Sequence, residues 1–173
     1  MIQRDLFLPS ADGAIRLLLL VARFSARTGR LDGRTKLAKL DFLLRYPRFF
    51  DRAYQIRTGE SSPIPSNPDD ENIESRMIRF RYGPWDPAYY SLLGSLIGRR
   101  LIEVIPTGRG LSFKASHEGA ALAVELASHP AWSETDRRAA LLHTHFNLTG
   151  ESLKRFIYAN FPEVVSASWG ELL

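Results

Sequence analysis

The sequence predicts a mainly helical domain that carries one small β-hairpin. Apolar residues recur at helical spacing along most of the chain, and past its middle two short β-prone runs flank a glycine-rich turn. The length of 173 residues suits a single domain, and 45% hydrophobic with 24% charged residues is typical of a folded globular chain. We therefore expect one domain over residues 1–173.

The first predicted helix begins at a capping residue, Asp12, and ends near Gly29. An aspartate oxygen can accept hydrogen bonds from the first free amides, and glycine favours a helix end. Apolar residues cover most of the helix circumference, which indicates a central helix. Its arginines are expected at the solvent-exposed edge: Arg16, Arg23 and Arg27.

A second helix is predicted over residues 34–44, with Asp32 as its cap. Its apolar stripe consists of Leu37, Leu40 and Leu44. Lys36 and Lys39 lie to one side of that stripe, where we expect exposed charges. Because proline disfavours a helical residue before it and suits a first turn, Pro47 should begin a third, short helix.

An exposed acidic loop is predicted at about residues 58–75, since this segment is rich in proline and acids and has almost nothing to bury. Residues 77–82 then alternate between apolar and basic side chains, which indicates a short strand that stops at Gly83. Asp86 should cap a fourth helix over residues 87–97.

A β-hairpin follows this helix. Residues 101–105 and 111–114 are β-prone, and residues 106–110 form a turn that contains two glycines and Arg109. The remainder of the chain predicts added helices at about residues 116–162.

These added helices have separate start signals. One is expected from Ser116 to about Ser128, and a last one begins at Thr149. Between them, a helix should begin at Ser133, because Ser133 and Asp136 have the spacing of a capping box.

Three helices, a short strand, a helix and a basic hairpin follow one another in the order of a winged helix, a helix-turn-helix core with an appended wing. In DNA-binding members the helix before the hairpin enters the major groove. Here that helix exposes Tyr90, Ser91 and Ser95, which are poorly suited to reading base edges. Sequence-specific recognition of DNA is therefore not expected, whereas Arg99, Arg100, Arg109 and Lys114 are candidates for contacts with phosphates, with a solvated turn as the alternative for Arg109.

The net charge of +4 conceals a division along the chain: residues 1–58 carry 12 Lys and Arg against 5 Asp and Glu, and residues 59–75 carry none against 5. Residues 76–115 are basic again, with 7 against 2. Two basic segments suit contact with phosphates or with an acidic partner, and a solvated basic surface is the alternative. The candidate contacts are Arg34, Lys36, Lys39, Arg99, Arg100, Arg109 and Lys114.

Large aromatic residues are candidates for a protein interface, with core packing as the alternative. Tyr82 and Trp85 flank the Gly83-Pro84 corner, and Trp169 belongs to an apolar segment at the end of the sequence.

The residue inventory favours a protein without a reaction centre. The absence of cysteine excludes disulfides, thiolate metal sites and cysteine nucleophiles. No phosphate-binding P-loop or serine-hydrolase motif is present. His143 and His145 would point about 200° apart on a helix, so they cannot share a metal ion. We predict no catalytic residue, cofactor or metal. Since no apolar run is long enough to span a bilayer and no signal peptide is recognisable, we also predict a cytoplasmic location.

Two short stretches resemble a known family. RTKLAKLDFLLRYP from Arg34 to Pro47, and RFRYGPWD from Arg79 to Asp86 with the Tyr89-Tyr90 pair that follows, are similar to the small middle component of bacterial ABC-three-component systems, the Lamassu-type anti-phage defence operons. The resemblance implies a non-catalytic subunit that sits with an SMC-like ATPase sensing foreign or abnormal DNA ends. It also implies an effector, commonly a nuclease, held inactive until triggered.

Two functions are therefore compared. The first is a winged-helix adaptor that bridges an SMC-like ATPase and a nuclease-type effector, with contacts to double-stranded DNA through phosphates and none to membranes. The second is a stand-alone winged-helix transcriptional regulator or antitoxin-like repressor.

Overall fold

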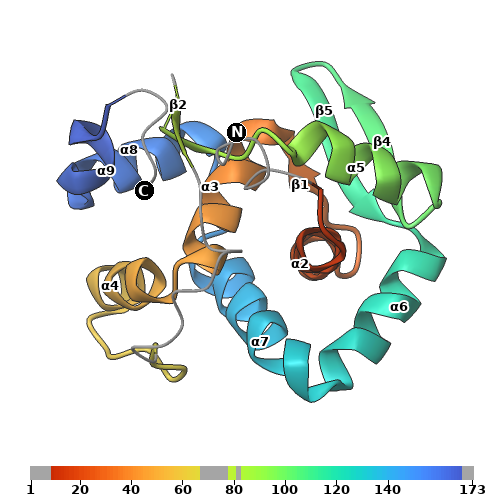
Figure 1. Cartoon of the computed structure of the whole chain (residues 1–173), viewed down its shortest axis with the longest axis horizontal. Helices are drawn as coiled ribbons and strands as arrows, with labels where there is room; N and C mark the ends of the chain where they lie inside the picture. Colours follow the sequence, from red (N-terminus) through yellow and green to blue (C-terminus); the bar gives the residue numbers. More distant parts are fainter. Residues whose placement is uncertain (1–8, 67–77, 81–82, 169–173) are drawn as a thin grey trace, which may run out of the picture.

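The computed structural model describes residues 9–66, 78–80 and 83–168, in which helices predominate and a small three-stranded antiparallel sheet is present (Figure 1). The elements are α2 (Ala11–Phe24), β1 (Leu31–Asp32), α3 (Gly33–Arg45), α4 (Pro47–Thr58), β2 (Ile78–Phe80), β3 (Gly83–Trp85), α5 (Tyr89–Gly98), β4 (Ile102–Thr107), β5 (Gly110–Ala115), α6 (His117–Ser128), α7 (Pro130–His145), α8 (Gly150–Asn160) and α9 (Pro162–Ser166). Of the described helices, none has the length and apolar character needed to cross a membrane.

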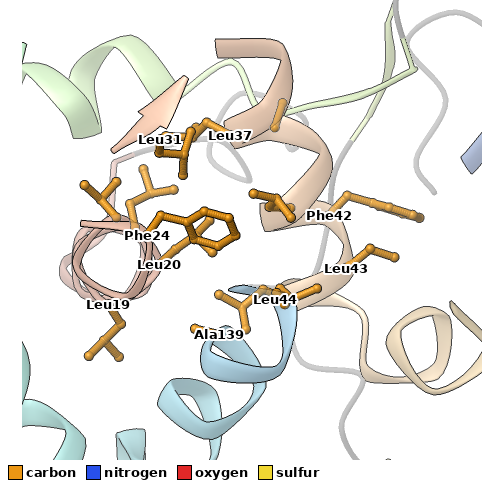
Figure 2. Close-up of a cluster of buried hydrophobic side chains, with 14 of the residues drawn as sticks. Leu19, Leu20, Phe24, Leu31, Leu37, Phe42, Leu43, Leu44 and Ala139 are labelled. Carbon is orange, nitrogen blue, oxygen red and sulfur yellow. The ribbon is translucent and has the colours of Figure 1, made fainter. Parts of the chain in front are cut away.

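The central helix is α2, which Figure 1 shows end-on with α3, α6, α7 and the hairpin around it. Every residue from Leu17 to Val21 is at most 1% exposed, as the apolar circumference of this helix predicts. Figure 2 shows Leu20 and Phe24 of α2 close to residues of α3, with Ala139 of α7 nearby. One core therefore unites the N-terminal helices with the added C-terminal ones.

Helix α2 differs from the prediction at both ends and in the exposure of one of its arginines. The cap is Ser10 rather than Asp12, because the Ser10 Oγ accepts a hydrogen bond of 2.9 Å from the Gly13 N–H. The helix ends at Phe24, earlier than the expected end near Gly29. Arg16 is not at the exposed edge either: only 6% of this residue is exposed, because it pairs with a carboxylate of α3.

The sheet has the strand order β1-β5-β4, so the strand before α3 lies beside the hairpin. The hairpin prediction is confirmed, with Ile102 opposite Ala115 and Thr107 opposite Gly110. On the other side of β5, Leu31 is opposite Phe113. The Ser112 hydroxyl donates to Asp32 at 2.7 Å, which explains why this N-cap residue makes no side-chain bond to its own helix.

Several predicted boundaries were wrong. Gly83–Trp85 does not simply stop a strand: it forms β3, which pairs antiparallel with β2. Helix α5 begins at Tyr89 rather than Pro87. Helix α7 begins at Pro130, and its cap is His129, which accepts from the Ala131 N–H. Asp136 does not complete a capping box, because it binds Arg23 of α2.

Aromatic residues contribute to the packing of the remaining helices. Phe42 of α3, Phe49 of α4 and Phe161 before α9 lie with ring centres 4.9–6.4 Å apart. The predicted starts at Pro47, Ser116 and Thr149 are confirmed, and Ser116 and Thr149 cap their helices through their hydroxyl groups. Of the loop predicted at 58–75, only residues up to 66 are described, and all but the buried Ile64 are at least partly exposed.

Candidate functional site

The two stretches that carry the family resemblance pack against each other. Asp41 and Arg45 of α3 meet Asp86 and Tyr89 at the start of α5, and Arg16 of α2 completes the group. We call these five residues the buried charge cluster. Its members come from α2, α3, α5 and the residues just before α5, at positions up to 73 residues apart in sequence, between Arg16 and Tyr89.

Asp41 is the centre of the buried charge cluster and is fully buried. Its carboxylate accepts hydrogen bonds from Arg16 Nε at 2.7 Å, from Arg45 Nε at 2.8 Å and from the Tyr89 hydroxyl at 2.7 Å. Arg45 also binds Asp86, whose other carboxylate oxygen accepts from the Ala88 N–H at 2.7 Å. Two arginines thus balance two aspartates, and their attraction and hydrogen bonds offset part of the cost of burying these charges.

Electrostatics keeps these groups in their usual charge states. Burial raises the pKa of Asp41, but Arg16 and Arg45 outweigh it and hold that pKa below its usual range. Burial, together with the Asp41 anion, raises the pKa of Tyr89 well above its usual value. The Tyr89 hydroxyl therefore stays protonated and donates to Asp41. A cluster that is sealed and internally paired cannot act on a substrate, so its role is to hold α3 and α5 in register.

An open pocket lies over the same junction. It has a volume of about 250 Å³ and is lined from α3 by Arg34, Thr35 and Lys39, and from the other stretch mainly by Gly83, Trp85 and Tyr90. We call it the Arg34 pocket. The described side chains that line it include two cations and two large aromatic rings, and none of them is a carboxylate.

The aromatic wall of the Arg34 pocket is held in place from below. Trp85 makes an edge-to-face contact with buried Tyr89, with ring centres 5.0 Å apart, and lies 6.1 Å from the exposed ring of Tyr90. Arg34 Nη1 donates to the Tyr90 hydroxyl at 2.6 Å. Tyr89 therefore links the buried charge cluster to the wall of the pocket.

Gly83 shapes the rim of the same pocket. Its φ is +99°, in the left-handed region where a residue with a side chain is strained. A Cβ at this position would also come within 3.1 Å of Lys39 Nζ. Glycine is therefore required where β3 passes over α3.

A second cavity of about 390 Å³ lies between α2, α5 and α6. Its walls are mostly aliphatic, with Leu18, Leu92 and Leu122 among them, and Arg99 stands at its edge. Among the described residues that line it, none is an aspartate, glutamate, histidine or lysine.

The structure separates the seven predicted basic contacts into different environments. Arg34, Arg99, Arg100 and Arg109 are exposed, and Lys114 is half-buried. Lys36 and Lys39 were expected at the surface, but they are only 5% and 2% exposed. The predicted exposure of these two lysines was wrong, because C-terminal segments pack over α3. Lys36 Nζ donates a hydrogen bond to Asn147 at 2.6 Å, and burial lowers the pKa of Lys36.

Of the three aromatic candidates, Trp85 is half-buried and forms a wall of the Arg34 pocket. Tyr82 and Trp169 lie outside the described residues. Sequence reasoning missed Tyr90 as a pocket residue and the whole buried charge cluster. One signal was present, because Asp41 and Arg45 are spaced i, i+4 among leucines that had to be buried.

The exposed arginines form a second basic region around the hairpin. Arg99 and Arg100 lie between α5 and β4, and Arg109 lies in the turn between the hairpin strands. Leu111 beside that turn is 45% exposed. In the described ranges, no three His, Asp or Glu side chains are grouped so that they could hold a metal ion.

Comparison with models of protein families, with curated proteins and with solved structures gave no match. The function must therefore be argued from this chain itself.

Proposed function

We propose that the chain is a winged-helix adaptor, a non-catalytic subunit that joins an SMC-like ATPase to a nuclease-type effector in a cytoplasmic anti-phage defence complex. The arrangement of elements supports a winged-helix core. Helices α2, α3 and α5 supply its three helices, and β4 and β5 supply the wing. The strand between the first two helices, β1, pairs with the second wing strand, which joins wing and helices in one unit.

The observation that carries the adaptor role is the exposed side of α5, the helix that would read DNA in a winged-helix regulator. Its exposed side chains are Tyr90, Ser91, Ser95 and Ile97. None is an arginine, lysine, asparagine or glutamine, the residues that best discriminate base edges in the major groove. Tyrosine and isoleucine instead suit contacts with protein.

The junction described above supports the family resemblance on which the partners depend. The stretches 35–47 and 78–90 are separated by about 30 residues that include α4, yet they share the buried charge cluster and the Arg34 pocket. Residues that appear as two separate motifs in the sequence thus serve one local structure. This is the pattern expected of a family signature with a single structural cause.

Contacts with DNA, where they occur in the complex, are assigned to the hairpin region. Arg99, Arg100 and Arg109 are exposed and carry charges that phosphates attract. The same arginines favour the alternative function, a stand-alone winged-helix regulator or antitoxin-like repressor. The composition of α5 counts against that alternative.

Co-purification tests the proposal. A tagged copy of the chain, expressed together with the genes adjacent to its own, should purify in fixed ratio with a coiled-coil ATPase and an effector. The matched control is the same tagged chain expressed without those genes, which should show no hydrolytic activity towards nucleotides or DNA. Recovery of a homodimer without those partners, bound to a palindromic DNA site, would support the repressor instead.

A further inference from the structure

The cavity between α2, α5 and α6 has an aliphatic wall and the cation Arg99 at its edge. Figure 1 shows α5 and α6 beside α2, and the wall includes Ile15, Leu92 and Leu122 from α2, α5 and α6 in turn. Ile15 and Leu122 are only partly buried, although both pack against the core. An apolar ligand in this cavity would remove more of this apolar surface from water, which favours binding. We call it the α2–α5–α6 cavity.

The composition and the size of the α2–α5–α6 cavity restrict the apolar part of a ligand. None of the described residues that line it is aromatic, so it offers no ring on which a nucleobase or another flat ligand could stack. One turn of an α-helix, as a cylinder about 10 Å wide and 5.4 Å long, occupies about 420 Å³. The cavity has about 390 Å³ and therefore holds less than one helical turn. A flexible alkyl chain suits such a space better than a segment of protein.

Arg99 specifies the other end of the ligand. It follows the last residue of α5, is exposed and lines the cavity. Within residues 9–66, 78–80 and 83–168, its guanidinium makes no hydrogen bond and no ion pair, and none of the described residues that line the cavity is a carboxylate. A guanidinium can donate two parallel hydrogen bonds to one carboxylate. The cavity therefore combines a site for an alkyl chain with a site for a single anionic group.

We propose that the α2–α5–α6 cavity binds a straight-chain aliphatic carboxylate of medium length, with its alkyl chain against the aliphatic wall and its carboxylate paired with Arg99. The volume lies near the lower end of the range of about 300–1,000 Å³ that is usual for small-molecule sites, which limits the length of the chain. This inference goes beyond the adaptor role and does not depend on it, because it concerns the isolated chain.

Calorimetric titration of the purified chain with hexanoate, octanoate and decanoate tests the proposal. Burial of each methylene contributes about 0.8 kcal/mol, so two added methylenes should tighten binding about tenfold. The uncharged 1-decanol has the same alkyl chain without the carboxylate. It should bind about 2- to 5-fold more weakly than decanoate, the range expected for an ion pair at an exposed arginine.

Two exposed serines on α5 supply a matched pair of variants for the alkyl site. Ser95 lines the cavity, and Ser91 lies four residues earlier on the same helix and does not line it. Ser95→Phe fills part of the cavity and should weaken the binding of decanoate at least about tenfold, as the loss of two buried methylenes would. Ser91→Phe adds the same ring outside the cavity and should leave the affinity unchanged. Circular dichroism checks that both variants fold.

Arg99 is tested separately from the alkyl site. Arg99→Gln should weaken the binding of decanoate about 2- to 5-fold and leave that of 1-decanol unchanged, because only decanoate carries a charge. The matched control is Arg109→Gln in the hairpin turn, which removes an exposed arginine outside the cavity and should affect neither ligand.

The contrary results are equally specific. The proposal is overturned if decanoate shows no measurable binding at about 1 mM, or if Ser95→Phe and Ser91→Phe have equal effects on its affinity. It is also overturned if Arg99→Gln changes the binding of decanoate and of 1-decanol equally. If Ser95→Phe, but not Ser91→Phe, abolished co-purification with a protein partner while decanoate did not bind, the cavity would be a docking site for protein. The adaptor role would then survive and this inference would not.

Discussion

Replacing Asp41 by asparagine should lower the free energy of unfolding by about 3–5 kcal/mol, the cost of breaking a buried ion pair from one side. The structure sets this size. Asp41 is fully buried and accepts from Arg16, Arg45 and Tyr89 at 2.7–2.8 Å. Asparagine is nearly isosteric, so little cavity forms. What is lost is the negative charge that Arg16 and Arg45 both contact, whereas the ion pair between Arg45 and Asp86 remains.

Thermal and urea unfolding followed by circular dichroism measure this effect. For a chain of this length, the midpoint should fall by about 6–20 °C. The matched control is Glu125→Gln on the exposed side of α6, which removes a carboxylate without a buried partner and should change stability by less than about 0.5 kcal/mol. If Asp41→Asn were as mild as this control, the buried charge cluster would not hold α3 against α5.

The difference in the free energy of unfolding between the native protein and Asp41→Asn should depend on pH with a definite sign. Because the folded chain holds the pKa of Asp41 below its value in the unfolded chain, the ionised carboxylate stabilises the fold above about pH 4. That contribution disappears as the pH falls through the folded pKa. The stability difference between the native protein and Asp41→Asn should therefore be largest at neutral pH and shrink in acid. A difference that grew on acidification would refute the assignment.

Two further predictions concern the helices and the hairpin. Gly119→Ala should destabilise the fold by about 1–3 kcal/mol, because the added Cβ would lie 1.9 Å from a backbone carbonyl oxygen. Gly94→Ala should stabilise the fold by about 0.5–1 kcal/mol, because no atom lies within 4 Å of the added Cβ. Equal shifts of the melting temperature in the two variants would contradict the packing around Gly119. Changing Arg99, Arg100 and Arg109 together to Ala should weaken association of the complex with double-stranded DNA and lower the slope of log affinity against log salt by about 2–3. Unchanged binding in a mobility-shift assay over a salt series would remove these residues from the DNA contact.

Local patterns predicted much of the fold. The hairpin could be predicted because its strands and its glycine-rich turn adjoin in sequence, and the starts at Pro47, Ser116 and Thr149 because capping is a local interaction. The predicted start of α7 at Ser133 was wrong because His129 caps the helix, which begins at Pro130. Only packing against α2 decides that Asp136 binds Arg23 rather than its own helix.

The candidate site could be predicted only in part, because burial of a charge depends on distant segments. Lys36 and Lys39 lie beside an apolar stripe and were expected at the surface. C-terminal residues such as Asn147 pack over this side of α3. Asn147 lies 111 positions after Lys36, so no local sequence pattern predicts their contact. Arg34 and Trp85 were both candidates, but for different reasons, and their convergence in one pocket with Tyr90 emerges only from the fold.

Selection from a random double-stranded DNA library by the isolated chain tests the adaptor proposal most directly. Because α5 exposes no side chain suited to reading base edges, the account predicts that repeated rounds of selection enrich no sequence motif, whatever non-specific affinity the hairpin arginines provide. Enrichment of a defined palindromic motif, lost when Tyr90 or Ser91 on α5 is replaced, would contradict the account and identify the chain as a sequence-specific regulator.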